Sequence, residues 1–193
     1  MKPMNIYMCG VGGQGIGLLS EVLSQACLAA GHEARGSDTH GIAQRHGTVV
    51  SHLRLGPGPA TPRVVPGEAD LVIGLERLEA MRGAVKMMKR GGTVLYYDTV
   101  YQPIAVRMER AEYPSTGDLA DVAGEIGGKA ERVRLEGMDD PRMQNVALIG
   151  RLVALGLIEN VTEEIAEQAL RDAVPPKVLD ANLAVFKQAL TGK

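Results

Sequence analysis

The sequence predicts an α/β fold: a layered, mainly parallel, Rossmann-like sheet with a helical C-terminal segment. Two observations lead to this prediction. Short apolar runs of strand length alternate with runs of helical periodicity over the first part of the chain. From about residue 142 onward only the helical periodicity remains. Because 193 residues suit one large α/β domain, we expect a single domain over residues 1–193, with its helical part beginning near residue 142.

A glycine-rich turn follows the first strand-like run, residues 5–8. Its glycines satisfy the pattern G-x-G-x-x-G at a strand-to-helix junction, where backbone N–H groups can approach an anion closely. The same spacing also arises where a strand simply turns sharply into a packed helix. The candidate phosphate-binding or cofactor-binding residues are Gly10, Gly12, Gly13, Gln14 and Gly15.

Residues 14–30 are predicted to form a helix, because apolar residues recur at steps of three and four and Gly31 follows as a stop. The next segment, residues 32–38, lies where a second parallel strand is expected. It lacks the apolar run of a strand buried on both faces, which departs from a plain Rossmann pattern. Residues 48–55 are predicted to form a strand.

The middle of the chain predicts a strand at 69–74, a helix at about 78–88 and a strand at 93–97. Met81, Val85 and Met88 are expected to face inward from that helix. Residues 104–108, after the turn at Pro103, predict one further strand.

The remaining segments are predicted to be helical. Residues 118–126 predict a short helix, and Thr162 is expected to cap a helix that the pair Pro175 and Pro176 ends. Residues 142–157 are apolar nearly all round. Such a helix lies deep in the core or is covered by another chain.

Composition excludes several classes of function. A net charge of −2 and an aromatic content of 3% argue against nucleic-acid binding. The sequence contains neither the apolar stretch of a membrane-spanning helix nor the features of a signal peptide, so a cytoplasmic location is expected. Two cysteines, Cys9 and Cys27, are too few for an iron–sulfur cluster and are expected to be buried as small hydrophobic residues.

A second concentration of polar side chains lies between residues 37 and 47. All four histidines fall in one window around it, from His32 to His52. A packed loop and an anion-binding loop both remain open. The histidine spacing fits no standard zinc pattern and no nucleophile stands beside a histidine, so we predict no metal site and assign no catalytic residue. The candidate substrate or interface loop comprises Asp38, His40, Gln44, Arg45 and His46.

These stretches carry a resemblance to a known family. Residues 10–16, 36–45 and 49–56 resemble the gamma-type subunit of 2-oxoacid:ferredoxin oxidoreductases. More narrowly, residues 74–82 and 175–186 resemble the beta subunit of indolepyruvate ferredoxin oxidoreductases. One departure is visible, because His46 stands before Gly47 where the family usually has a pair of glycines.

The resemblance implies a thiamine-diphosphate-dependent enzyme that converts a 2-oxoacid, of the indolepyruvate or arylpyruvate type, to acyl-CoA and CO2 and passes electrons to ferredoxin. Thiamine diphosphate, Mg and the iron–sulfur clusters would belong to a large alpha subunit. This chain would hold no cofactor alone, would be inactive alone, and could contact coenzyme A.

Two alternatives remain at this point. The chain could be a stand-alone dinucleotide- or flavin-binding protein, in which Asp38 would bind the ribose hydroxyls. It could also be a non-catalytic scaffold subunit, in which the apolar helix at 142–157 docks a partner.

Overall fold

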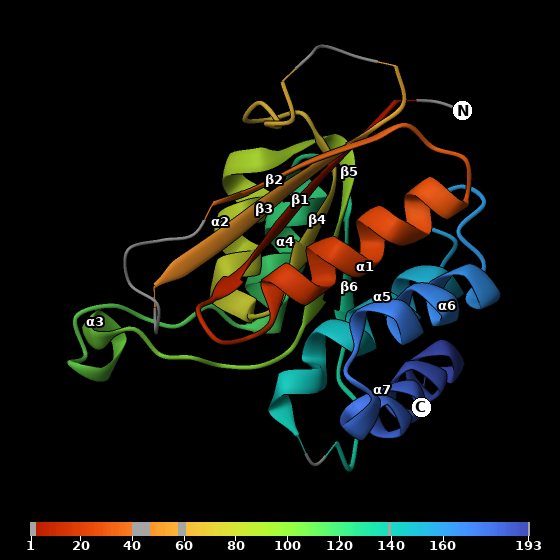
Figure 1. Cartoon of the computed structure of the whole chain (residues 1–193). Helices are drawn as coiled ribbons and strands as arrows, with labels where there is room; N and C mark the ends of the chain where they lie inside the picture. The colour runs from red at the N-terminus through yellow and green to blue at the C-terminus, as the bar shows by residue number, and fades with distance from the viewer. Residues whose placement is uncertain (1–2, 40–46, 58–60, 139, 193) are drawn as a thin grey trace.

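A six-stranded sheet forms the centre of the chain in a computed structural model that describes residues 3–39, 47–57, 61–138 and 140–192. The strands lie in the order β2-β3-β1-β4-β5-β6 (Figure 1). Pairs β1–β4, β4–β5 and β5–β6 are parallel, whereas β3 runs antiparallel to both neighbours. The strands are β1 (Met4–Val11), β2 (Ala34–Thr39), β3 (Thr48–Leu55), β4 (Ala69–Gly74), β5 (Met88–Tyr97) and β6 (Lys129–Val133). The sheet is therefore mostly parallel, as predicted.

Helices cover both faces of this sheet. The α1 helix packs over β1, β2 and β3, and α5 packs over β5 and β6, with α6 and α7 outside them (Figure 1). On the opposite face, α2 covers β1, β4 and β5, and α4 covers β5 and β6. The helices are α1 (Ile16–Ala29), α2 (Arg77–Met87), α3 (Ile104–Arg107), α4 (Thr116–Glu125), α5 (Gln144–Ala154), α6 (Glu163–Ala173) and α7 (Pro176–Thr191), with a 3-10 turn at Pro141–Met143. No helix among these described segments has both the length and the apolar character needed to cross a bilayer.

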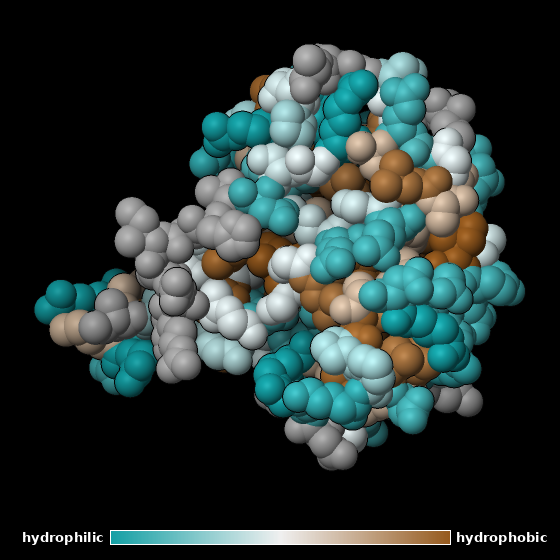
Figure 2. Space-filling view, viewed as in Figure 1, coloured by the Kyte–Doolittle hydropathy of each residue, from teal (hydrophilic) through white to brown (hydrophobic). Residues whose placement is uncertain are grey.

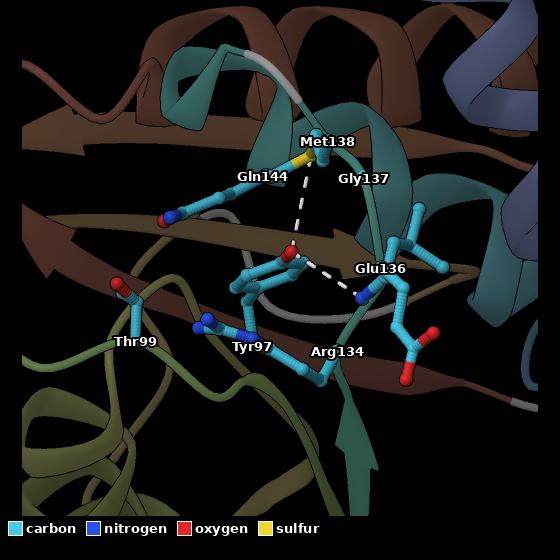
Figure 3. A pocket seen from close by; sticks show the side chains of 8 residues that line it. Tyr97, Thr99, Arg134, Glu136, Gly137, Met138 and Gln144 are labelled. Atoms are coloured by element: carbon cyan, nitrogen blue, oxygen red, sulfur yellow. Dashed lines mark hydrogen bonds between the residues drawn. The ribbon is translucent and has the colours of Figure 1, made fainter.

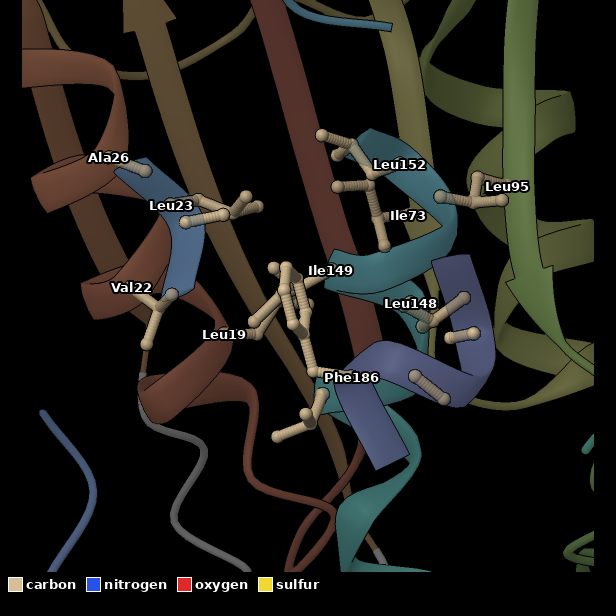
Figure 4. Close-up of a cluster of buried hydrophobic side chains, with 14 of the residues drawn as sticks. Leu19, Val22, Leu23, Ala26, Ile73, Leu95, Leu148, Ile149, Leu152 and Phe186 are labelled. Carbon is tan, nitrogen blue, oxygen red and sulfur yellow. The ribbon is translucent and has the colours of Figure 1, made fainter. Parts of the chain in front are cut away.

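The larger core lies between the sheet and the four-helix side. Figure 4 shows Leu19 and Leu23 of α1, Ile149 of α5 and Phe186 of α7 meeting side chains that rise from the strands. Because the sheet lies under α5 while α6 and α7 cover its outer side, α5 is apolar nearly all round. The helix therefore lies deep in the chain's own core and does not offer the face with which the scaffold hypothesis has it dock a partner. Figure 2 shows mainly hydrophilic side chains over the outer surface of these helices, with hydrophobic ones in the gaps.

The position of β2 in the sheet explains why residues 32–38 lack an apolar run. Residues Ala34–Thr39 form β2 at the edge of the sheet, where β2 pairs only with β3 among the described strands. An edge strand with partly solvated faces does not need a continuous apolar sequence.

Three further expectations differ from the structure. Residues Ile104–Arg107 form the short helix α3, which stands out from the body of the molecule, rather than a strand (Figure 1). The face of α2 that packs inward carries Ala80, Ala84 and Met87, whereas Val85 is 68% exposed. Of the three residues expected to face inward, Met88 is buried at the start of β5 and Met81 packs in part against the core, so only Val85 is wrongly predicted. Strand β6 was not anticipated, because Lys129–Val133 is short and mostly polar.

Gly150 brings α5 and α7 together. A Cβ atom added at Gly150 would lie 2.6 Å from the Phe186 carbonyl oxygen and 2.8 Å from the Ala189 Cβ. Exchanging glycine for alanine inside a helix ordinarily stabilises by about 0.5–1 kcal/mol. We expect Gly150→Ala instead to lower the free energy of unfolding by about 1–2 kcal/mol in urea denaturation, because the backbone of α7 must move. A stabilised Gly150→Ala variant would contradict this packing.

Candidate ligand-binding edge of the sheet

The carboxyl ends of β1, β4, β5 and β6 meet at one edge of the sheet. After β1 the chain enters α1 on one face, and after β4 it enters α2 on the other face. The adjacent pair β1–β4 is therefore a topological switch point, where the loops diverge and leave a crevice. The glycine turn lies at this point.

The glycine turn adopts backbone conformations that favour glycine. Gly13 has φ of 100° and Gly15 has φ of 78°, both in the left-handed region. Gly15 is the N-cap of α1 and provides no side-chain hydrogen bond, and the first turn of α1 contains no acidic residue. The amides at the start of α1 therefore lack a capping side chain and remain suited to an anion.

Gln14 has a structural role in the turn. Its Oε1 accepts a hydrogen bond from the Val11 amide at 2.7 Å, and its Nε2 donates to the Leu75 carbonyl at 3.0 Å. Nε2 also lies 3.3 Å from Oε1 of Gln144 at the start of α5. Because Gln14 is only 5% exposed and its amide is engaged on both sides, it shapes the turn and joins β1, β4 and α5.

Close packing explains why Gly10 and Gly15 are glycines. A Cβ at Gly10 would lie 2.9 Å from the Leu75 Cβ, and one at Gly15 would lie 2.5 Å from Nδ2 of Asn145. Asn145 is buried and donates from Nδ2 to the Gly15 carbonyl at 3.0 Å. The residue that follows β4 and helix α5 therefore pack against the turn and fix its position.

The second predicted loop leaves and rejoins the sheet at the same edge. Thr48 of β3 pairs with Val11, and the Gly47 carbonyl accepts a hydrogen bond from the Gly12 amide at 2.9 Å. His40, Gln44, Arg45 and His46 lie outside the described residues, so their positions relative to the turn stay predictions.

Asp38 is engaged within the fold. Its Oδ1 accepts hydrogen bonds from Ser20 of α1, at 3.0 Å, and from Ser51 of β3, and the two serine hydroxyls are 2.9 Å apart. In a dinucleotide site the acidic residue ends the strand next to β1, but here β3 separates β2 from β1. This topology and the two serine contacts argue against Asp38 as a ribose ligand.

The two histidines in the described part of the chain also have local partners. Nε2 of His32 lies 2.7 Å from the Glu159 carbonyl, and Nδ1 of His52 accepts from the Val64 amide at 3.1 Å. Within the described residues, no group of three histidine, cysteine, aspartate or glutamate side chains is placed to hold a metal ion.

A hollow of about 480 Å³ lies beside the turn, beyond the ends of β5 and β6. In Figure 3 the end groups of Gln144 and Arg134 point toward the side of Tyr97 on which Thr99 lies. The Tyr97 hydroxyl accepts from the Leu135 amide at 3.4 Å and lies 3.9 Å from the Met138 sulfur. The sequence does not indicate these residues, because β6, which positions Arg134 and the following loop, is short and mostly polar.

A second hollow, of about 530 Å³, lies on the α2 side of the turn. It is lined in part by Val11, Thr48, Arg82 and Tyr101. The Glu76 carboxylate accepts hydrogen bonds from the Glu79 amide at 2.9 Å and from the Tyr101 amide at 3.3 Å. These bonds hold two residues that line the second hollow. Burial raises the pKa of Glu76, and these backbone hydrogen bonds oppose the rise.

An ion-pair network ties the strand ends together between these hollows. Asp98, just after β5, accepts from Nε of Arg77 at 2.8 Å and from Nε of Arg132 at 2.7 Å. Its side chain is 5% exposed, and that of Arg77 is 18% exposed. The network fixes the start of α2 against β5 and β6.

Both thiols are buried within the fold. Cys9 is 1% exposed and Cys27 is fully buried. Burial raises the pKa of Cys9 far above its usual range and that of Cys27 to about 12. We therefore expect iodoacetamide at pH 8 to leave the native chain unlabelled and to label both cysteines after unfolding in urea, as read by mass spectrometry. Rapid labelling of the native chain would contradict this burial.

A doubly covered α/β sheet with a glycine turn and two hollows at its carboxyl edge has the architecture in which α/β domains place their ligand sites. The family described as pyruvate ferredoxin/flavodoxin oxidoreductase matches residues 5–192. The chain belongs to this family.

Named relatives agree with the family assignment. The chain is 34% identical to indolepyruvate oxidoreductase subunit IorB of Thermococcus kodakarensis, covering 97% of this chain and 94% of the relative. Its fold is similar to a keto/oxoacid ferredoxin oxidoreductase gamma subunit from Geobacter sulfurreducens, with TM-score 0.68, 19% identity and coverage of 98% and 97% of the two chains. It is also similar to part of 2-oxoglutarate:ferredoxin oxidoreductase from Magnetococcus marinus, solved with 2-oxoglutarate, coenzyme A and succinyl-CoA bound. There the TM-score is 0.72 and the identity 19%, over 99% of this chain and 31% of that one.

Proposed function

We propose that the chain is the non-cluster subunit of a 2-oxoacid:ferredoxin oxidoreductase that acts on indolepyruvate or a related arylpyruvate. The relationship to an indolepyruvate oxidoreductase subunit over nearly the full length of both chains is the observation that carries this proposal. In this reaction the substrate carboxylate leaves as CO2, an electron pair passes to ferredoxin, and the coenzyme A thiol takes the acyl group and loses its proton. Residues 1–193 act as one gamma-type domain in this scheme.

The redox cofactors belong to a large alpha subunit in this proposal. An iron–sulfur cluster is usually held by four thiolates, whereas this chain has two cysteines, and both are buried in separate elements. Thiamine diphosphate with Mg in the partner supplies the carbanion chemistry. This chain would shape the cleft between the subunits and is inactive alone.

We assign the glycine turn to a phosphate group of coenzyme A. The uncapped start of α1, the left-handed Gly13 and Gly15 and the adjacent switch point support this assignment. Gly10 and Gln14 would position the turn through their contacts with Leu75. Gly12 would link the turn to the second loop through its hydrogen bond to Gly47. The loop residues His40, Gln44, Arg45 and His46 would face the same cleft, with Asp38 anchoring the loop to α1 and β3.

Gly17 offers a direct test of the phosphate assignment. It is exposed in the first turn of α1, and a Cβ there would meet nothing within 4 Å. We expect Gly17→Asp to keep or raise the thermal stability, since a carboxylate favours a helix N-terminus by about 0.3–1 kcal/mol. The same charge should repel phosphate and raise the KM for coenzyme A about tenfold in the complex.

Gly17→Asn is the matched control, because it adds nearly the same volume without charge. It should alter the KM for coenzyme A much less than Gly17→Asp does. Equal KM values for Gly17→Asp and the wild type would exclude a phosphate at this helix end.

Affinity purification from the native source tests the subunit assignment. We expect a tagged chain to recover a large partner, with thiamine diphosphate and iron in the complex and neither in the separated chain. Recovery of the chain alone, or of a partner without iron and thiamine, would refute the proposal.

A further inference from the structure

A third hollow lies on the α2 face of the sheet, where β3 extends beyond the edge of α2. It encloses about 370 Å³ between Tyr7, His52, the segment 61–66 and the end of α2. This hollow shares none of its lining residues with the two hollows at the carboxyl edge. Its volume lies at the lower end of the range for small-molecule sites.

Two residues that line this hollow, Tyr7 and His52, carry hydrogen-bond donors. Nδ1 of His52 accepts from the Val64 amide at 3.1 Å, so the neutral ring carries its proton on Nε2. Burial and the nearby Arg63 lower the pKa of His52, which keeps the ring neutral at pH 7. Tyr7 packs edge-on against His52 with ring centroids 5.2 Å apart, and burial, chiefly, raises the pKa of its phenol. The phenol therefore stays a protonated donor.

Two cations stand at the rim of the hollow. Arg63 and Lys86 are exposed, and within the described part of the chain neither forms an ion pair with a carboxylate. The residues that line the hollow include no aspartate or glutamate. The hollow thus combines two positive charges with neutral donors and contains no competing anion.

The walls are apolar. Val50, Val64, Val65 and Met87 line them, and Val65 is 49% exposed although it borders the hollow. A bare inorganic anion would gain nothing from these walls, whereas an organic acid would bury its apolar body against them. The two cations at the rim and the donors of the lining residues would bind its carboxylate.

We propose that this third hollow binds a small organic monocarboxylate with an apolar body about the size of one ring. This site is separate from the proposed coenzyme A contact and does not depend on it. Phenylacetate is a suitable probe, and phenylacetamide is its uncharged isostere.

Isothermal titration of the full chain and of the assembled complex tests the proposal. We expect phenylacetate to bind both preparations, and phenylacetamide to bind at least about tenfold more weakly. The Arg63→Gln/Lys86→Gln double variant, which changes only exposed side chains, should weaken phenylacetate binding by about tenfold or more. Lys177→Gln, which removes an exposed positive charge on α7, away from the hollow, is the control and should bind as the wild type does.

Three results would overturn the proposal. They are no phenylacetate binding at millimolar concentration, equal affinity for the amide, and an unchanged affinity of the double variant. Binding to the isolated chain that disappears in the complex would overturn the small-molecule assignment, because a carboxylate of the partner would then fill the hollow.

Discussion

Gly15→Ala is expected to lower the free energy of unfolding by about 2–4 kcal/mol. A non-glycine residue at φ of 78° costs about 1–2 kcal/mol. The added Cβ would also lie 2.5 Å from Nδ2 of Asn145. That amide cannot simply swing away, because its Nδ2 bonds to the Gly15 carbonyl and its Oδ1 accepts from the Val146 amide at 2.8 Å. Urea denaturation of the full chain measures the loss.

Gly13→Ala separates the two causes of this loss. Gly13 also has a left-handed φ, but a Cβ there would meet nothing within 4 Å. We expect it to cost only the conformational part, about 1–2 kcal/mol. Equal losses for the two variants would show that the contact between Gly15 and Asn145 does not constrain the turn.

Asp98→Ala is expected to destabilise the chain by about 3–5 kcal/mol, because it leaves the largely buried Arg77 guanidinium without its carboxylate. Arg77 would keep its hydrogen bond to the Pro114 carbonyl, at 3.1 Å, and its position over the Tyr113 ring. Neither contact neutralises its charge. Thermal and urea denaturation would both measure the loss.

Arg132→Gln is the appropriate control for Asp98→Ala. It removes the other cation of the network, whose side chain is 55% exposed and stays hydrated when unpaired. We expect a loss below about 1 kcal/mol. Similar losses for the two variants would contradict the view that Asp98 serves mainly to neutralise Arg77.

Elements with strong local patterns were predictable from the sequence. Helix α1 repeats its apolar residues at helical spacing, and α6 begins where Thr162 accepts a hydrogen bond from the Ile165 amide. The glycine turn was also located correctly, because a strand of apolar residues leads directly into it.

Elements whose form depends on tertiary contacts were not predictable. Strand β6 is mostly polar and exists because it adds to the edge of β5. Residues 104–107 have the apolar character of a strand, but no neighbouring strand pairs with them among the described residues, and they form a short helix instead. No local sequence pattern indicates that β3 lies between β1 and β2. Its antiparallel pairing with both strands depends on the arrangement of the whole sheet.

The candidate site was predictable only in part. The positions of the glycines marked the turn, but its partners are Leu75, which follows β4, and Gln144 and Asn145 of α5. The amide residues of α5 stood out as polar positions in an apolar helix. That pattern alone does not show that these amides contact the glycine turn. Gly15 lies 130 residues before its partner Asn145.

We propose that this chain functions only as one subunit of a 2-oxoacid:ferredoxin oxidoreductase. Ferredoxin reduction by indolepyruvate and coenzyme A, measured with the isolated chain, the isolated large partner and their mixture, tests this claim most directly. We predict no turnover by the isolated chain and coenzyme A-dependent turnover when the two are combined. Turnover by the isolated chain, or a partner whose activity is the same with and without it, would contradict the claim.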